Sequence, residues 1–289
     1  MCKIIELNAR IFKGYFKAGC AMVFGIASAI LLLFKKEDFR IDTIRKSAGV
    51  FFILIMAALA YALIKVMCYR KIESIKKKLI LRYGNLWKYA FSRNKNKRIV
   101  VVNVNTTFDT IVDEKLSEVN KPLVSPTTIH GQWIKQMQKR EVTIADIDKK
   151  IEESLRIQKI EPTKILEQSI KERGKLNCYP KGTIACYEYQ NTIFYLLALS
   201  EFDENNNAQN TKEELVETIT QLIDYYEHHG NGFDIYVPIM GTGQSRTGIN
   251  KSEALEVIRS LFRLYQDKIH GCANIIVYSK DRDEVSIGG

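Results

Sequence analysis

Two long stretches without a charged side chain, both near the N-terminus, constrain this chain more than any other feature of its sequence. One covers residues 18–34 and contains 17 residues, and the other covers residues 47–64 and contains 18. A helix advances about 1.5 Å per residue, so each stretch nearly crosses the roughly 30 Å hydrocarbon core of a bilayer. Flanking Lys and Tyr side chains can extend the helices to the interface. We therefore predict a transmembrane helical hairpin over residues 1–70, with spans at about residues 16–34 and 47–68.

A cleaved signal peptide is the alternative for the first stretch, and a buried core helix is the alternative for the second. A signal peptide needs a small-residue cleavage site after its apolar core, whereas Leu33 and Phe34 lead directly into Lys35. A second apolar stretch that follows so closely also favours a membrane anchor.

Small residues recur at four-residue spacing in both stretches. They are Ala21, Gly25 and Ala29 in the first stretch and Ala58 and Ala62 in the second. A helical face of small residues favours close approach of membrane helices, although such spacing also arises by chance in apolar sequence.

The net charge of +10 is distributed very unevenly along the 289 residues. Residues 1–98 contain 21 Lys and Arg against 5 Asp and Glu, whereas residues 99–289 contain the remaining 22 against 28. This asymmetry excludes a uniformly basic nucleic-acid-binding protein, and we expect no nucleic acid as a partner. Basic residues are abundant before the first apolar stretch and after the second. The positive-inside rule then favours both ends, and the large C-terminal part, on the cytoplasmic side.

Short β-rich runs alternate with helical periodicity from about residue 74 onward. We expect strands at residues 78–83, 98–104, 183–187, 192–199, 233–239 and 273–278, and helices at residues 132–140, 144–157, 162–173, 212–228 and 251–268. The last two helices begin with capping-box pairs, Thr211 with Glu214 and Asn250 with Glu253. This alternation predicts an α/β fold with a mixed or mostly parallel sheet and helices on its faces.

A glycine-rich loop connects the expected strand 233–239 to the expected helix 251–268. Such a loop can direct backbone N–H groups and the helix dipole at an anion, and Arg246 can pair with phosphate oxygens. The loop is not a P-loop, because Ile249 and Asn250 occupy the Lys and Ser/Thr positions. A glycine-rich turn without a ligand is the alternative. The candidate phosphate-binding residues are Gly241, Thr242, Gly243, Gln244, Ser245, Arg246 and Thr247.

A second candidate site follows the expected strand 98–104. Asn103 and Asn105 carry amides that can hydrogen-bond a ribose or a base edge, and Phe108 can stack on a ring. Ligands of open α/β sheets bind in the crevice outside the carboxyl ends of the strands, which is where these residues and Asp109 are expected. Asn and Thr after a strand are also common turn residues, so a purely structural role is the alternative.

Several segments taken together resemble a macro domain. They are residues 84–86, 101–109, 125–132, 181–183 and above all 238–248. With the preceding hairpin and short basic linker, the chain is similar to the type II Thoeris anti-phage effectors A, which have two N-terminal transmembrane helices and a divergent macro domain. The resemblance implies a three-layer α/β/α macro domain with a mixed sheet over residues 71–289.

The resemblance also implies a function. In such effectors the macro domain binds an ADP-ribose-derived signal, histidine-ADP-ribose in the membrane-anchored type, which a TIR-domain partner makes from NAD. Binding then triggers homo-oligomerisation, and the helices disrupt the lipid bilayer in an abortive infection. The protein is accordingly expected in the bacterial inner membrane as a multi-pass protein with a cytoplasmic macro domain, and no cofactor beyond this ligand is expected.

Individual roles follow from the same resemblance. Asn85, followed by Leu86, stands where macro domains usually carry the Asp that receives the adenine amino group. Asn103 and Asn105 fall in the loop that approaches the distal ribose, and residues 241–247 match the diphosphate-binding loop. Ser125 and His130 belong to the segment that replaces the triple-glycine run of hydrolytic macro domains. This replacement counts against ADP-ribosyl hydrolysis.

Catalytic or metal-binding residues are not evident in the sequence. Only four histidines occur, and His130 alone lies in a candidate site. The six cysteines form no C-x-x-C pair, which indicates neither a disulfide scaffold nor a zinc module. We therefore expect a ligand-gated membrane effector rather than an enzyme. A membrane-anchored ADP-ribosyl hydrolase and a passive reader of ADP-ribosylated proteins are the alternatives.

Overall fold

The computed structural model describes residues 2–33, 44–69, 71–73, 78–115, 118–119, 122–169, 171–202, 208–209, 211–241 and 249–288. The chain divides into two compact units. One, here called the hairpin unit, comprises Met1–Lys71 and Lys280–Gly289, and the other, the α/β unit, comprises Ile72–Ser279.

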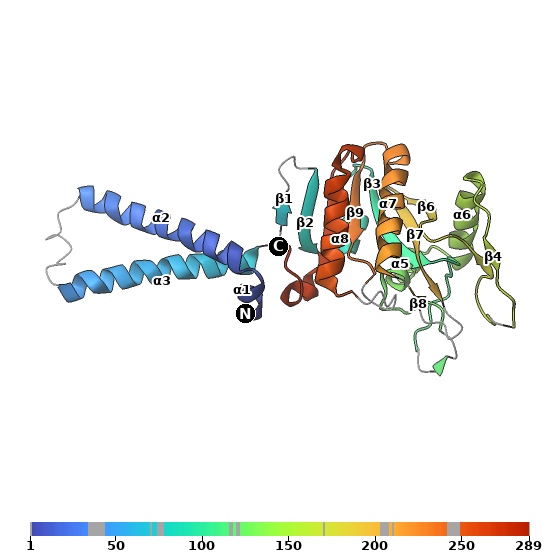
Figure 1. Ribbon diagram of the computed structural model, residues 1–289, viewed down its shortest axis with the longest axis horizontal. Helices are drawn as coiled ribbons and strands as arrows, with labels where there is room; N and C mark the ends of the chain where they lie inside the picture. The colour runs from blue at the N-terminus through green and yellow to red at the C-terminus, as the bar shows by residue number, and fades with distance from the viewer. Residues whose placement is uncertain are drawn as a thin grey trace. The chain divides into compact units, whose positions relative to one another are not determined.

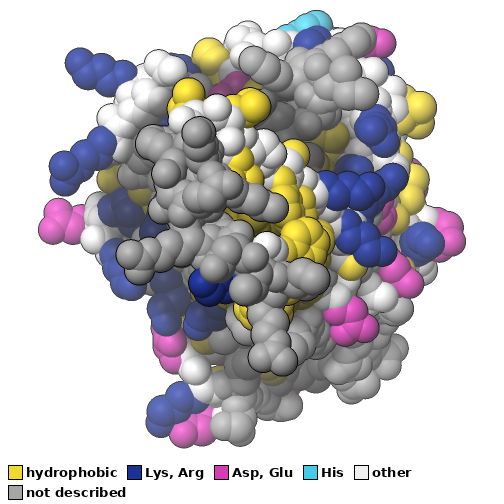
Figure 2. Space-filling model, turned by 90° about the vertical axis from the view of Figure 1, so that its left-hand side faces the viewer, with side chains coloured by type: hydrophobic (Ala, Val, Ile, Leu, Met, Phe, Trp, Pro, Cys, Tyr) yellow, Lys and Arg dark blue, Asp and Glu magenta, His cyan; other side chains and the backbone are white. Residues whose placement is uncertain are grey.

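Long apolar helices dominate the hairpin unit. The short helix α1 (Cys2–Leu7) precedes α2 (Ala9–Leu33) and α3 (Ile44–Cys68), which lie side by side (Figure 1). Both long helices are of a length and composition that can cross a membrane. Large apolar side chains on them are exposed, for example Leu32 at 87% and Ile53 at 65%. Figure 2 shows hydrophobic side chains (yellow) at the surface near the middle of the view.

Close approach of α2 and α3 occurs at Gly19. A Cβ atom added there would lie 3.0 Å from the Tyr61 ring and 3.1 Å from the Ala58 carbonyl oxygen, whereas a Cβ at Gly25 would meet nothing within 4 Å. Ala58 and Ala62 are fully buried. The small residues of α3 therefore do lie at the contact, but on α2 the contact residue is Gly19, one turn and a half away from the expected Gly25.

A mixed β-sheet forms the centre of the α/β unit. In the described part of the chain its strand order is β1-β2-β10-β9-β3-β7-β6, with β8 paired to β7. Neighbours from β2 to β7 along this order are parallel, and β6 and β8 run antiparallel to β7. The strands are β1 (Lys71–Glu73), β2 (Leu79–Gly84), β3 (Arg98–Asn105), β6 (Ile184–Tyr189), β7 (Thr192–Phe202), β8 (Ala208–Gln209), β9 (Asp234–Pro238) and β10 (Ala273–Tyr278).

Helices cover both faces of this sheet and produce three layers. Alternate residues of β3 point to opposite faces, so Val100 and Val102 join the core with Trp133, while the equally buried Ile99 and Val101 face the other way. Helices α7 and α8 lie in front of the sheet in Figure 1. The helices are α4 (Leu86–Ala90), α5 (Ile129–Gln138), α6 (Ile144–Ile157), α7 (Lys212–His229) and α8 (Lys251–Leu264). The predicted three-layer α/β/α architecture with a mixed sheet is thus confirmed.

Most of the expected elements are present within one or two residues of their predicted bounds. Thr211 and Glu214 form a complete capping box at the start of α7, and Asn250 and Glu253 form another at the start of α8. These reciprocal bonds satisfy backbone N–H groups that a helix start otherwise leaves unpaired.

The prediction of a helix at residues 162–173 is wrong. Strand β4 (Lys164–Ile165) instead pairs antiparallel with β5 (Asn177–Cys178), and we call residues 163–178 the docking hairpin. The backbone N–H of Leu166 donates to the Leu176 carbonyl at 2.9 Å, which closes the hairpin further. Strand pairing and the Lys171–Asp109 ion pair, whose nitrogen and oxygen lie 2.7 Å apart, stabilise the hairpin against the locally expected helix, and Ile165 is 68% exposed.

Candidate functional site

The turn after β3 is held by side chains from within the turn itself. The Asn105 amide donates to Asp109 Oδ2 at 2.7 Å, and the Asp109 backbone N–H donates back to Asn105 Oδ1 at 2.9 Å. The Thr107 hydroxyl donates to the same carboxylate at 2.6 Å. All three residues are buried. Asn105 and Asp109, both expected at a ligand, therefore have structural partners that the chain supplies.

A lysine from the docking hairpin completes this cluster. Lys171 Nζ lies 2.7 Å from Asp109 Oδ2 and also donates to the Thr107 hydroxyl at 2.9 Å and the Lys175 carbonyl at 2.7 Å. The Lys175 backbone N–H donates to the other carboxylate oxygen of Asp109 at 2.7 Å. The Lys171 side chain is only 5% exposed and Asp109 is fully buried. Such a buried pair is tolerated because each charge is matched and its remaining donors and acceptors are hydrogen-bonded.

A second ion pair holds the docking hairpin. Arg173 Nη2 lies 2.7 Å from Asp113 Oδ1, and the other oxygen of Asp113 accepts the Leu123 backbone N–H at 2.8 Å. Gly174 follows Arg173 directly in the chain. It has φ of +83°, and a Cβ added there would lie 2.3 Å from Asp109 Oδ1. The close approach and the left-handed backbone both require glycine at this position.

The start of α5 packs against the same turn. The Thr128 hydroxyl accepts the Gly131 N–H at 3.1 Å and donates to the Ser125 carbonyl at 2.7 Å. A Cβ on Gly131 would lie 2.1 Å from that carbonyl oxygen, so only glycine fits there. Ser125 and His130 are both buried. The segment that replaces the triple-glycine run thus serves as a tightly packed helix cap.

His130 is held in its neutral form. Its pKa is lowered to about 4, chiefly by burial; the charge of Asp109 opposes this shift and that of Lys175 adds to it. A neutral, buried imidazole is poorly suited to general acid–base catalysis at pH 7.

Asn103 differs from its neighbours because part of it has no partner. Its side-chain oxygen Oδ1 is buried and accepts no hydrogen bond from the described residues. It lies near the carboxyl end of β3, the edge at which ligands of such sheets bind. A buried amide oxygen without a donor is costly, and a ligand that donates to it would remove that cost.

The expected adenine-side residues lie at the carboxyl end of β2. Asn85 caps α4, and its Oδ1 accepts the Trp87 N–H at 2.9 Å, while Leu86 is buried in the core. β2 and β3 lie in one sheet whose intervening strand pairs are all parallel, so Asn85 and Asn103 lie at the same sheet edge. The Asn85 amide oxygen is thus already used by the helix cap.

The glycine-rich loop is described only at its first residue. Gly241 is buried and has φ of +85°, a backbone conformation that favours glycine. Thr242, Gly243, Gln244, Ser245, Arg246 and Thr247 lie outside the described residues. Their diphosphate role stays a prediction of the sequence.

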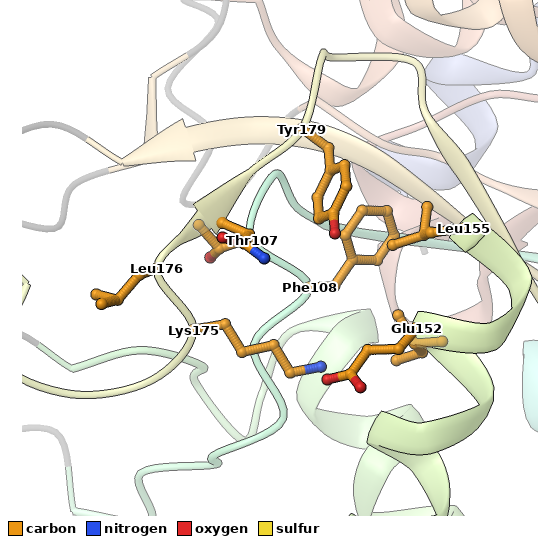
Figure 3. A pocket seen from close by; sticks show the side chains of 9 residues that line it. Thr107, Phe108, Glu152, Leu155, Lys175, Leu176 and Tyr179 are labelled. Atoms are coloured by element: carbon orange, nitrogen blue, oxygen red, sulfur yellow. The ribbon is translucent and has the colours of Figure 1, made fainter. Parts of the chain in front are cut away.

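A pocket of about 260 Å³ opens on the far side of the β3 turn, lined by Phe108, by α6 and by the return arm of the docking hairpin (Figure 3). Phe108 is buried, and its ring centroid lies 5.7 Å from that of Tyr179 in a T-shaped pair. Burial is the largest cause of a raised pKa at Tyr179, so its hydroxyl stays protonated at neutral pH. Phe108 therefore contributes to this pocket rather than to the Asp109 cluster.

Sequence reasoning missed the lysines that complete the site. Lys171 lies 62 positions from Asp109 along the chain, and its segment had been expected to be helical. The signal was the basic, glycine-containing run Lys171, Arg173, Gly174 and Lys175 in an otherwise acidic part of the chain. In the described part of the chain no group of three or more His, Cys, Asp or Glu side chains is placed to hold a metal ion.

Comparison with known proteins identifies the family. Residues 80–279 match the family described as Thoeris protein ThsA, Macro domain. The Thoeris protein ThsA of Bacillus amyloliquefaciens (strain Y2) is 23% identical over 193 residues, which are 64% of this chain and 59% of that protein. The match thus spans about three-fifths of the length of that curated relative.

Solved macrodomains of Oceanobacillus iheyensis are also similar to this chain. The structure with ADP has a TM-score of 0.38 at 10% sequence identity, and the match covers 74% of this chain and 91% of that macrodomain chain. The structure with MES bound has a TM-score of 0.37 at 12% identity with the same coverage. The family match extends across more than half of the residues, and it shows that this chain belongs to the macro-domain family of the Thoeris protein ThsA.

Proposed function

We propose that this protein is a membrane effector of an anti-phage defence system whose macro domain binds an ADP-ribose-derived signal. The family match and the unpartnered Asn103 oxygen at the ligand edge of the sheet support this proposal. Asn103 is the observation that carries it, because a ribose hydroxyl is a donor that would satisfy this buried oxygen.

The signal, by the same proposal, is histidine-ADP-ribose made from NAD by a TIR-domain partner. Its binding would trigger homo-oligomerisation and disruption of the bacterial inner membrane through α2 and α3, and so abortive infection. The two apolar helices support a membrane location, with the protein multi-pass and its macro domain cytoplasmic. In the predicted binding mode, loop residues 242–247 would hold the diphosphate.

A gated effector is favoured over an ADP-ribosyl hydrolase. His130, the histidine of the candidate site, is buried and neutral, and the segment that carries it is engaged in capping α5. Incubating the full chain with an ADP-ribosylated protein tests this choice. Release of ADP-ribose would support the hydrolase, and binding without release would support the effector or a passive reader.

Calorimetric titration of the full chain in lipid nanodiscs with ADP-ribose and histidine-ADP-ribose tests the binding site. We expect Asn103→Ala to weaken binding about ten-fold, since one hydrogen bond to a buried group is lost. Asn274→Ala is a matched control: Asn274 Oδ1 is also buried and has no hydrogen-bond partner among the described residues, but it lies near the start of β10, at the opposite sheet edge. Equal affinity of the Asn103→Ala and wild-type chains would refute the site.

Light scattering of the same samples separates an effector from a passive reader. An effector is expected to increase in oligomer size when the signal is added, whereas a reader keeps one size.

A further inference from the structure

The pocket beside Phe108 is a partly open cavity that the proposed nucleotide site does not use. Its walls come from the turn after β3, from Ile151 and Leu155 on α6, from residues 175–177 of the docking hairpin, and from Tyr179 just after that hairpin (Figure 3). A volume of about 260 Å³ accommodates a single ring or a short chain rather than a whole nucleotide.

A strained backbone conformation at Phe108 places this aromatic side chain in the wall of the pocket. Phe108 has φ of +50°, a left-handed conformation that is uncommon and strained for a bulky residue. Hydrogen bonds maintain it: the Phe108 N–H donates to the Asn105 carbonyl at 3.0 Å, and the Tyr179 N–H donates to the Thr106 carbonyl at 2.9 Å. The result is a pair of rings, Phe108 and Tyr179, that line one cavity.

Two carboxylates and one ammonium lie at or beside the pocket: Glu152 and Lys175 line it, and Asp148 pairs with Lys175. Lys175 Nζ lies 2.6 Å from Asp148 Oδ1, so its charge is already paired. Asp148 also accepts the Thr110 hydroxyl at 2.8 Å. Glu152, one helical turn beyond Asp148 on α6, lines the pocket, and in Figure 3 the side chains of Glu152 and Lys175 extend toward each other. Two carboxylates against one ammonium disfavour a phosphate or carboxylate ligand and favour a cation.

We infer that this pocket binds a small organic cation, an ammonium attached to a ring, with its charge at Glu152 and its ring against Phe108 and Tyr179. Carboxylate and aromatic faces are the groups that recognise such cations. The cation is either a free amine or the amino-bearing end of a larger nucleotide ligand, and the recognition chemistry is the same. The inference goes beyond the proposed nucleotide site and does not depend on it.

Three ring compounds that differ in charge test the inference on the full chain in nanodiscs. Tyramine carries the ammonium alone, tyrosine carries an ammonium and a carboxylate, and 4-hydroxyphenylacetate carries the carboxylate alone. We expect tyramine to bind about ten-fold more tightly than 4-hydroxyphenylacetate by ligand-observed NMR. Glu152→Gln should weaken tyramine binding about ten-fold, and Glu153→Gln, the next exposed residue of α6, should leave it unchanged.

Equal binding of tyramine and 4-hydroxyphenylacetate, or unchanged tyramine binding by the Glu152→Gln variant, would overturn the inference. Competition then identifies the source of the cation. Displacement of tyramine by an amine conjugate of ADP-ribose, but not by ADP-ribose itself, supports the end of a larger ligand. Displacement by neither supports a free amine. Asn103→Ala should leave tyramine binding intact, so a failure of the nucleotide site is distinguishable from a failure of this pocket.

Discussion

At the scale of single residues, the β3 turn shows how a buried charge is maintained. Asp109 accepts hydrogen bonds from four groups, including the Lys171 ammonium and the Lys175 backbone N–H. These contacts fix the turn that contains Phe108 to Asn105, the last residue of β3, and Asn103 lies two residues earlier in the same strand. The candidate site and the pocket therefore share a single rigid support.

His130 makes the stability of this support depend on pH. Its pKa is about 4 in the folded chain and about 6.5 when unfolded, so the unfolded chain binds more protons between these values. The stabilisation is fully present above pH 6.5 and is lost as pH falls toward 4. We expect His130 to contribute a loss of about 3 kcal/mol over this range. Chemical denaturation from pH 7 to 4 measures it.

The difference between wild type and His130→Gln isolates this contribution from the titration of carboxylates. His270→Gln, at an exposed position, controls for the loss of a histidine as such. If wild type and His130→Gln lose stability in parallel between pH 6.5 and 4, the burial argument for His130 is wrong.

At the scale of elements, two predictions from the local sequence pattern differ from the tertiary contacts in the structure. The sequence predicts a helix at residues 162–173, but two ion pairs and strand pairing fix residues 163–178 as a hairpin on the β3 turn. On α2 the spacing of small residues pointed to Gly25, whereas Gly19 faces Ala58 and Tyr61. Both errors arise because periodicity does not identify which partner lies opposite a residue.

We predict that Gly19→Leu separates α2 from α3, because the added side chain would meet the Tyr61 ring and the Ala58 backbone at about 3 Å. Overpacking of this kind typically costs about 1–3 kcal/mol. Disulfide crosslinking between cysteines introduced into the two helices should become slower. Gly25→Leu, where a side chain meets open space, is the matched control and should crosslink at the wild-type rate. Equally fast crosslinking in Gly19→Leu would contradict the packing.

At the scale of the whole molecule, the chain passes between its two units twice, after residue 71 and after residue 279. The second passage follows β10 directly through the 3₁₀ helix η4 (Ser279–Asp283). Within the hairpin unit, Arg282 donates to the carbonyls of Val66 and Met67 at the end of α3, and the Ser286 hydroxyl donates to Asn8 Oδ1 at 2.9 Å. The last residues of the chain are thus part of the base of the hairpin.

We predict that Ile287→Asp loosens this base without affecting nucleotide affinity. Ile287 is fully buried in the hairpin unit, and burying a carboxylate there is costly. Hydrogen exchange of the full chain in nanodiscs should speed up at residues 280–288, while affinity for ADP-ribose stays within about two-fold of wild type. Lys280→Asp, at an exposed position, is the control. Unchanged exchange at residues 280–288 would contradict this role of the C-terminal segment.

The sequence was enough to predict the two apolar helices, the alternation of strands and helices, the capping boxes of α7 and α8, and the resemblance that the family match confirmed. These depend on composition and on contacts between residues close in the chain, which local patterns record. The tertiary structure was needed to show that Lys171 neutralises Asp109, that Asn103 Oδ1 has no hydrogen-bond donor in the described part of the chain, and that Phe108 packs against Tyr179. Those outcomes depend on which distant segments meet, and no spacing along the chain encodes the geometry of that meeting.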